Sequence, residues 1–336
     1  MGNNVFGIDL GTYNIRIYSG HNESVIIEKN MIAIENKTNL YAYGDSAFDM
    51  YEKAPAHIQT SFPLTNGVIA DIKNMQTLIK CFIEIASKNN YKNADYYITV
   101  PTDITDVEKR AFYDLIKESK LKPRNIYMME KAVADGIGLG VDVKSSQGMM
   151  VVDVGYNTTE ISVLSLGGIV LSKLIKTGGF KFDDAIRNVV RREYNLVIGA
   201  KTAERLKISL KELKQKNEPA LIYGRDIISG LPMEREVSIA MIEDSMKEHF
   251  KTIIDNVKQI LERTPPELSA DIYRNGLYLT GGGSLVSDFG VTLANGTGLK
   301  VNLAQDAEES VIQGVAEVSK NDRLRSVVYT IDQMEG

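Results

Sequence analysis

The sequence predicts an α/β protein made of two similar domains. Short apolar strands alternate along the chain with amphipathic helices, which is the pattern of a mixed α/β fold. A buried strand, an acidic turn and a returning strand occur together twice, about half a chain apart, at residues 5–18 and 149–164. The 336 residues are also more than one compact domain usually holds. We therefore expect a duplicated architecture.

Strands and helices alternate in the first half of the chain. Residues 5–8 form an apolar strand, and residues 15–18 alternate as a strand that returns from the turn between them. Apolar residues within 72–86 recur at helical spacing and predict a helix with one buried face. Residues 97–100 read as a strand, and a capping box that begins at Thr105 predicts the start of another helix.

The second half repeats this alternation. A buried strand at 149–152 leads into an acidic turn, and residues 161–164 return from it. Apolar residues at helical spacing over 246–261 predict a long helix, which Pro265 and Pro266 end. A strand at 276–280 then runs into a turn of three glycines.

Composition narrows the class of protein. Hydrophobic residues make up 43% of the chain and charged residues 25%, which is typical of a folded globular protein. The net charge of −5 provides no basic field for nucleic acid. The single cysteine, Cys81, excludes a disulfide within the chain, and the three histidines have no cysteine partners at zinc-ligand spacing. With neither a signal peptide nor an apolar stretch of about 20 residues, the sequence predicts a cytoplasmic protein.

Glycine-bearing turns follow three of the predicted strands, at residues 9–12, 153–155 and 281–284. Glycine lets backbone N–H groups approach a phosphate closely. Asp9 and Asp153 each follow a buried strand directly, and two carboxylates near a polyphosphate are best explained by a hydrated Mg²⁺ between them. Taken alone, the turn at residues 9–12 is compatible with an ordinary hairpin turn, and the turn at 281–283 with a helix-entry loop. Their order and spacing together favour a nucleotide site.

These motifs carry a resemblance. Residues 7–12 resemble the first phosphate loop of the ATPase superfamily that contains actin, sugar kinases and heat-shock chaperones, and residues 153–160 resemble its second phosphate loop. Residues 279–284 are similar to its adenosine loop, and residues 202–207 to the helix whose Glu and Lys hold the ribose and purine. Within this superfamily the chain most resembles the MreB family over nearly its whole length. The segments that carry this closer resemblance are 67–71, 165–170, 195–199, 224–226, 229–232 and 261–268.

The resemblance implies an actin-like, ribonuclease H-like fold of two domains around a central cleft. It places domain I at residues 1–140 plus 308–336, with a small inserted subdomain at about 30–65. Domain II is then 141–307, with an insertion at about 180–245.

The resemblance also implies site residues. The ATP-binding residues are expected to be Gly11, Thr12, Tyr13, Asn14, Gly155, Tyr156, Asn157, Glu204, Lys207, Gly281, Gly282, Gly283 and Ser284. Asp9 and Asp153 are expected to hold Mg²⁺ through water, with Thr158 positioned to orient a water or a phosphate oxygen.

The sequence departs from the family near the γ-phosphate. Where the family has the glutamate that polarises the attacking water, an alignment without gaps places Lys131, and Glu130 falls on the preceding, non-catalytic glutamate. Tyr156 and Asn157 replace two glycines of the second phosphate loop, and Tyr13 stands where a small residue is usual. One interpretation is a protein that binds ATP and hydrolyses it slowly. The other is that Glu130 or another carboxylate takes over after a local shift.

The resemblance implies a cytoskeletal protein that forms paired homopolymeric filaments. These would lie on the inner face of the cell membrane, where they would work with the cell-wall elongation machinery to organise cell-wall synthesis and so direct cell shape. A loop at 88–93, with Tyr91 and two lysines, is a candidate membrane contact. The alternatives are a non-polymerising pseudo-ATPase scaffold and, with no second substrate motif to support it, a phosphotransferase of the same superfamily.

Overall fold

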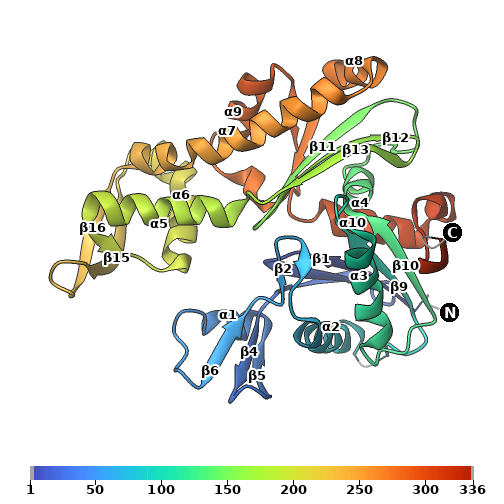
Figure 1. Ribbon diagram of the computed structural model, residues 1–336, viewed down its shortest axis with the longest axis horizontal. Coiled ribbons are helices and arrows are strands. Elements are labelled where there is room, and N and C mark those ends of the chain that lie inside the picture. Colours follow the sequence, from blue (N-terminus) through green and yellow to red (C-terminus); the bar gives the residue numbers. More distant parts are fainter. Residues whose placement is uncertain (1–3, 89, 334–336) are drawn as a thin grey trace.

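The two acidic hairpins begin the central sheets of two halves that face each other (Figure 1). A computed structural model describes residues 4–88 and 90–333. The first sheet has the order β10-β9-β1-β2-β3. Its strands are β1 (Val5–Leu10), β2 (Asn14–Ser19), β3 (Ser24–Lys29), β9 (Asp95–Val100) and β10 (Asn125–Glu130). β1, β2 and β3 are antiparallel to one another, whereas β9 and β10 are parallel to β1.

The second sheet repeats this topology in the order β13-β12-β11-β17-β18. Its strands are β11 (Met149–Val154), β12 (Thr159–Ser165), β13 (Gly168–Ile175), β17 (Leu277–Thr280) and β18 (Val301–Leu303). Again three strands are antiparallel and the last two run parallel to the first strand of the hairpin. The duplicated α/β architecture predicted from the two hairpins is therefore confirmed.

Helices cover the outer faces of both sheets. On the first sheet these are α2 (Ile72–Ser87) and α3 (Asp106–Glu118), and the predicted capping box at Thr105 is present at the start of α3. On the second sheet α7 (Ile239–Arg263) contributes the longest apolar face and ends at Thr264, before Pro265. The shorter α8 (Pro266–Asn275) and α9 (Phe289–Thr297) follow it. Short 3₁₀ turns are also present, at η1 (Gly282–Leu285), η2 (Asp322–Val327) and η3 (Ile331–Gln333).

Two helices lie between the sheets and join them. α4 (Lys131–Gly138) and α10 (Ser310–Lys320) share one core with apolar residues of both sheets. They approach so closely that a Cβ at Gly138 would lie 1.7 Å from the Ser310 carbonyl oxygen, and one at Gly314 would lie 1.8 Å from that of Ala134. Glycine is required at both positions because no side chain fits between the backbones.

Smaller sheets extend from each half on the same side of the molecule (Figure 1). The first half carries the sheet β5-β4-β6 and the helix α1, and the second carries the sheet β14-β15-β16 with α5 and α6. Their bounds are β4 (Ile32–Glu35), β5 (Asn39–Tyr43), α1 (Gly44–Asp49), β6 (Ile58–Ser61), α5 (Gly179–Tyr194), β14 (Leu196–Val197), α6 (Ala200–Lys216), β15 (Ala220–Asp226) and β16 (Pro232–Val237). A two-stranded ribbon, β7 (Leu64–Thr65) and β8 (Val68–Ile69), connects the first small sheet to α2.

The loop considered as a membrane contact packs its tyrosine partly against the protein. Tyr91 is half-buried against the core of the first half, and its hydroxyl donates to Glu84 Oε1 at 3.2 Å. Asn89 of this loop lies outside the described residues. The membrane contact of this loop stays a prediction, and in this conformation the Tyr91 hydroxyl is directed to Glu84. Within 4–88 and 90–333, no helix combines the length and apolarity needed to span a bilayer.

Candidate nucleotide-binding site

A cavity of about 570 Å³ opens between the two halves, and all three predicted glycine turns line it. The β1–β2 turn contributes its loop residues from one side, and the β11–β12 turn faces it from the other. The third turn follows β17, where a positive φ of 79° at Gly281 starts η1. A Cβ at Gly281 would lie 2.2 Å from Asp153 Oδ1, so glycine is required where this turn passes the carboxylate.

Most of the expected site residues line this cavity. They are Asp9, Gly11, Thr12, Tyr13, Asn14, Lys131, Asp153, Gly155, Tyr156, Thr158, Glu204, Lys207, Gly281, Gly282 and Gly283. Asn157 and Ser284 do not line it. The Ser284 hydroxyl instead donates to the Gly281 carbonyl at 2.6 Å, which stabilises the third turn from behind.

Glu130 is not in the cavity. Its Oε1 accepts from Lys109 Nζ at 2.7 Å and from the Tyr329 hydroxyl at 3.2 Å. Burial raises the pKa of Glu130, whereas the Lys109 contact opposes that rise. The structure therefore does not support Glu130 as the group that replaces the expected catalytic carboxylate, because Lys109 and Tyr329 engage it outside the cavity lining.

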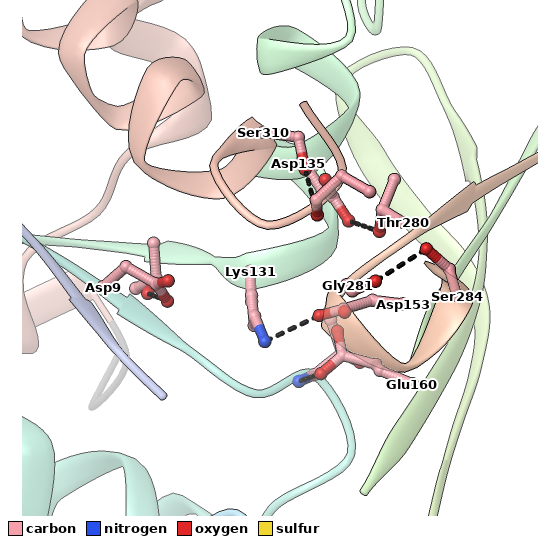
Figure 2. Close-up of polar contacts among 12 residues, drawn as sticks. Asp9, Lys131, Asp135, Asp153, Glu160, Thr280, Gly281, Ser284 and Ser310 are labelled. Atoms are coloured by element: carbon pink, nitrogen blue, oxygen red, sulfur yellow. Dashed lines mark hydrogen bonds and ion pairs between the residues drawn. The ribbon is translucent and has the colours of Figure 1, made fainter. Parts of the chain in front are cut away.

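Lys131, the first residue of α4, reaches into the cavity instead. Its Nζ lies 2.6 Å from Asp153 Oδ2, and Figure 2 shows it between Asp9 and Asp153 with Glu160 nearby. Burial alone would lower the pKa of Lys131, but the carboxylates of Asp153, Asp9 and Glu160 outweigh it and raise that pKa above its ordinary value. This side chain therefore carries a positive charge in the centre of the cleft.

The sequence interpretation missed two charged residues that stand opposite the paired aspartates. In the first hairpin Arg16 pairs in register with Asp9, and in the second Glu160 pairs in register with Asp153. Arg16 Nη1 lies 3.5 Å from Asp9 Oδ2, and Glu160 accepts from the backbone N–H of Thr102 at 3.4 Å. Both line the cavity. The hairpin register could have identified them, since each faces an aspartate already singled out.

Two further carboxyl groups near Lys131 have displaced pKa values. Burial raises the pKa of Glu160 to about 7, against the pull of Lys131. Burial and the Asp153 charge raise the pKa of Asp135 to about 7 as well. Asp135 accepts a hydrogen bond from the Thr280 hydroxyl at 2.6 Å and so links α4 to the strand that leads into the third turn (Figure 2).

At the other end of the cavity, the expected ribose and purine ligands already have partners within the chain. Glu204 Oε2 accepts from the Tyr13 hydroxyl at 2.5 Å. Lys207 Nζ lies 2.8 Å from Asp183 Oδ1 and donates to the Gly179 carbonyl at 3.3 Å. Lys207 is thereby held in place by Asp183, another residue that the sequence interpretation did not single out.

The residues present do not fit a magnesium ion held by Asp9 and Asp153 as expected. A hydrated Mg²⁺ would need carboxylate oxygens free to accept from its water shell. Here Asp153 Oδ2 contacts the Lys131 ammonium and Asp9 Oδ2 contacts the Arg16 guanidinium, while Asp9 Oδ1 accepts from the Thr99 hydroxyl at 3.3 Å. A magnesium ion would therefore compete with a cation of the chain for each carboxylate. Among the described residues, no group of three or more His, Cys, Asp or Glu side chains could hold a metal directly.

Comparison with known proteins identifies the family to which this chain is similar. A model of the MreB/Mbl protein family matches residues 3–326. The cell shape-determining protein Mbl of Bacillus subtilis is 37% identical over 323 residues, which cover 95% of this chain and 96% of that protein.

Solved structures agree on the fold. MreB5 of Spiroplasma citri bound to AMPPNP superposes with a TM-score of 0.88 at 34% identity, covering 95% of this chain and 97% of that one. The ADP-bound form of the same protein gives a TM-score of 0.88 at 36% identity, covering 94% of this chain and 96% of that one. A protomer of the MamK double helical filament, at 19% identity and a TM-score of 0.76, covers 94% of this chain and 98% of that one and shares the fold.

Proposed function

The chain belongs to the MreB/Mbl family of actin-like proteins, and from this we propose that it is an ATP-binding cytoskeletal protein that assembles into filaments. The observation that carries the proposal is the convergence of the three glycine turns on one cavity between duplicated halves. The similarity to MreB5 structures that contain AMPPNP and ADP supports a nucleoside di- or triphosphate as the ligand.

Each part of the cavity has a role in this proposal. The backbone N–H groups at Gly11 and Gly283 would contact phosphates, and Thr12 and Thr158 would add hydroxyls to the same region. Glu204 and Lys207 lie on α6 and would hold the ribose and purine. Glu204 would then exchange its Tyr13 contact for the ribose hydroxyls or share it with them.

Hydrolysis is proposed to be slow. A carboxylate can accept a hydrogen bond or proton from the attacking water, but the Lys131 ammonium has donors only. Glu130 is engaged outside the cavity. Thr158 lines the cavity and can still position a water, so hydrolysis is expected to be reduced rather than absent.

In the cell, the filaments are proposed to be paired and to lie on the inner face of the membrane, where they would organise cell-wall synthesis. The family relationship supports this role. Assembly on the membrane would let many weak contacts add along one filament. Co-sedimentation of filaments and of unassembled protein with anionic liposomes tests it, and equal retention of the two forms would remove the avidity argument.

The test of the proposed function is assembly that depends on nucleotide. Purified full-length protein is sedimented with ATP, with ADP, with a non-hydrolysable ATP analogue and without nucleotide, and the pellets are viewed by electron microscopy. Filaments with ATP and with the analogue are expected, and far fewer without nucleotide. Gly155→Ala, which adds a methyl group 3.1 Å from the Thr158 carbonyl oxygen in the phosphate turn, should weaken nucleotide binding and assembly together. Gly290→Ala on α9 is the matched control, because its new methyl group would lie 3.7 Å from the Leu279 side chain, an ordinary contact distance.

A second candidate is a non-polymerising scaffold that binds ATP without turning it over. The ion pair of Lys131 with Asp153, in place of a free carboxylate near the phosphates, favours it. Tight ATP binding with no sedimentation and no filaments at any concentration tested would select this function over the first.

A further inference from the structure

Three carboxylates surround the ammonium group of Lys131 in the cleft. Asp153 Oδ2 contacts it at 2.6 Å, and Asp9 and Glu160 are near enough to raise its pKa. Asp9 and Asp153 come from equivalent places in the two hairpins, so they approach the lysine from opposite halves of the molecule (Figure 2). The lysine thus sits where the two phosphate turns converge.

This ion pair is open to the cavity in a way that a purely structural pair is not. The Lys131 side chain is 23% exposed and lines the cavity beside Thr12 and Thr158. The Lys207 side chain at the other end of the cavity, paired with Asp183, is more enclosed, at 10% exposed. Lys131 also begins a helix that packs between the two sheets, so its backbone is held beside the cavity. A polyphosphate in the cavity would therefore meet this charge.

A cation in this position does the electrostatic work of a bound metal ion. It neutralises Asp153, which would otherwise repel the phosphates, and its remaining N–H groups can donate to phosphate oxygens. Placing a lysine where the resemblance implies a glutamate raises the local charge by two units, which is the charge of a magnesium ion. A magnesium ion that entered the same place would have to displace the Lys131 ammonium from Asp153. The positive charge of the ammonium would repel the ion.

We propose that Lys131 is a tethered counter-ion that takes the place of magnesium, so that this chain binds nucleoside triphosphate with little dependence on a divalent cation. The proposal rests on the proposed function, because it presumes that the cleft binds a nucleotide. It concerns the cation requirement alone, and it can fail while nucleotide binding stands.

The experiment compares nucleotide affinity with and without magnesium. A fluorescent ATP analogue is titrated into the full chain in buffer with excess Mg²⁺ and in buffer with EDTA, and the ratio of the two dissociation constants is the readout. For the natural chain we expect a ratio within about threefold. For Lys131→Glu we expect binding in EDTA to be weaker by at least about 30-fold than in Mg²⁺, the scale of removing one member of a desolvated charge pair.

Two further variants separate charge from structure. Lys131→Arg keeps the positive charge and should keep the ratio near that of the natural chain. Lys211→Gln removes a different lysine that lines the same cavity and should weaken binding equally in both buffers, leaving the ratio unchanged. Circular dichroism and thermal melting confirm that each variant is folded.

Two outcomes would overturn the proposal. A natural chain that loses more than about tenfold in affinity when magnesium is removed overturns the proposal by itself, even if Lys131→Glu does not fold. A Lys131→Glu ratio equal to that of the natural chain overturns it as well. If the natural chain binds the analogue in neither buffer, the proposed nucleotide-binding function fails too, and that result is distinguishable from the other two.

Discussion

The rings of Tyr13 and Tyr156 pack against each other with their centroids 4.4 Å apart, although they belong to opposite halves of the molecule. Each tyrosine stands in a phosphate turn at a position where the resemblance implies a small residue. Phe62 from the first half and Phe180 from the second flank the pair. Two substitutions that look like separate departures in the sequence are therefore a single contact across the cleft.

This aromatic contact should slow nucleotide exchange. Removing the Tyr156 ring with Tyr156→Ala eliminates an aromatic pair of about 0.5–1.5 kcal/mol and part of the apolar area that closes the cleft. We expect release of a fluorescent ADP analogue to become about tenfold faster, measured by stopped flow after mixing with excess unlabelled nucleotide. Tyr223→Ala, at a tyrosine on β15 that is exposed and distant from the cavity, is the control. An unchanged release rate in Tyr156→Ala would mean that the contact between Tyr13 and Tyr156 does not limit nucleotide release.

The hydrolysis rate should depend on the residue at position 131. Lys131→Glu introduces a carboxylate that can orient and polarise the attacking water, an effect worth on the order of 10²–10⁴-fold when the rest of a site is intact. We expect single-turnover hydrolysis in filaments, followed with excess Mg²⁺, to be faster in the variant than in the natural chain. Lys211→Gln serves as the charge control, with no acceleration expected. A natural chain as fast as Lys131→Glu would show that some other group already activates the water.

Stability should depend on pH through Glu160. Burial raises the folded-state pKa of this carboxyl from 4.5 to about 7, so the folded chain binds its proton more tightly than the unfolded chain. The stabilisation from that proton is fully present below the unfolded pKa, and it is lost as the pH rises toward 7. Glu160→Gln removes this titration, and the variant should gain stability relative to the natural chain by about 1–3 kcal/mol between pH 4.5 and pH 8.

Urea unfolding of both proteins at several pH values measures this difference. Asp135 titrates in the same range in both proteins, so only the difference between their pH profiles reports on Glu160. Parallel profiles would show that Glu160 is charged throughout, held so by Lys131.

The contact between α4 and α10 should tolerate no side chain at Gly314. A Cβ there would lie 1.8 Å from the Ala134 carbonyl oxygen, so the two helices must separate in Gly314→Ala. We expect a loss of at least about 1–3 kcal/mol in the free energy of unfolding, measured by urea denaturation. The control is Gly290→Ala, whose new methyl meets only the end of Leu279 at 3.7 Å. Equal stability of the two variants would mean that α10 can shift away from α4 at little energetic cost.

Local patterns in the sequence were enough to predict the duplicated α/β fold and the strands that carry the turns, and the family resemblance added most of the expected site residues that the cavity brings together. The reason is that strand alternation, the helical apolar stripe over Ile72–Ser87 and the capping box at Thr105 are determined by neighbours along the chain. The glycines of the three turns could also be identified in the sequence, because glycine is the residue that lets the backbone approach other groups so closely.

Contacts between distant segments were decided only by the tertiary structure. The sequence placed Lys131 at a catalytic position, but only the folded chain shows that its partner is Asp153, 2.6 Å away on the other sheet, and that Glu130 turns toward Lys109. The same holds for the partial burial of Tyr91. Such pairings depend on how two sheets meet around α4 and α10, and electrostatic and packing energies between residues far apart in sequence leave no periodic trace along the chain.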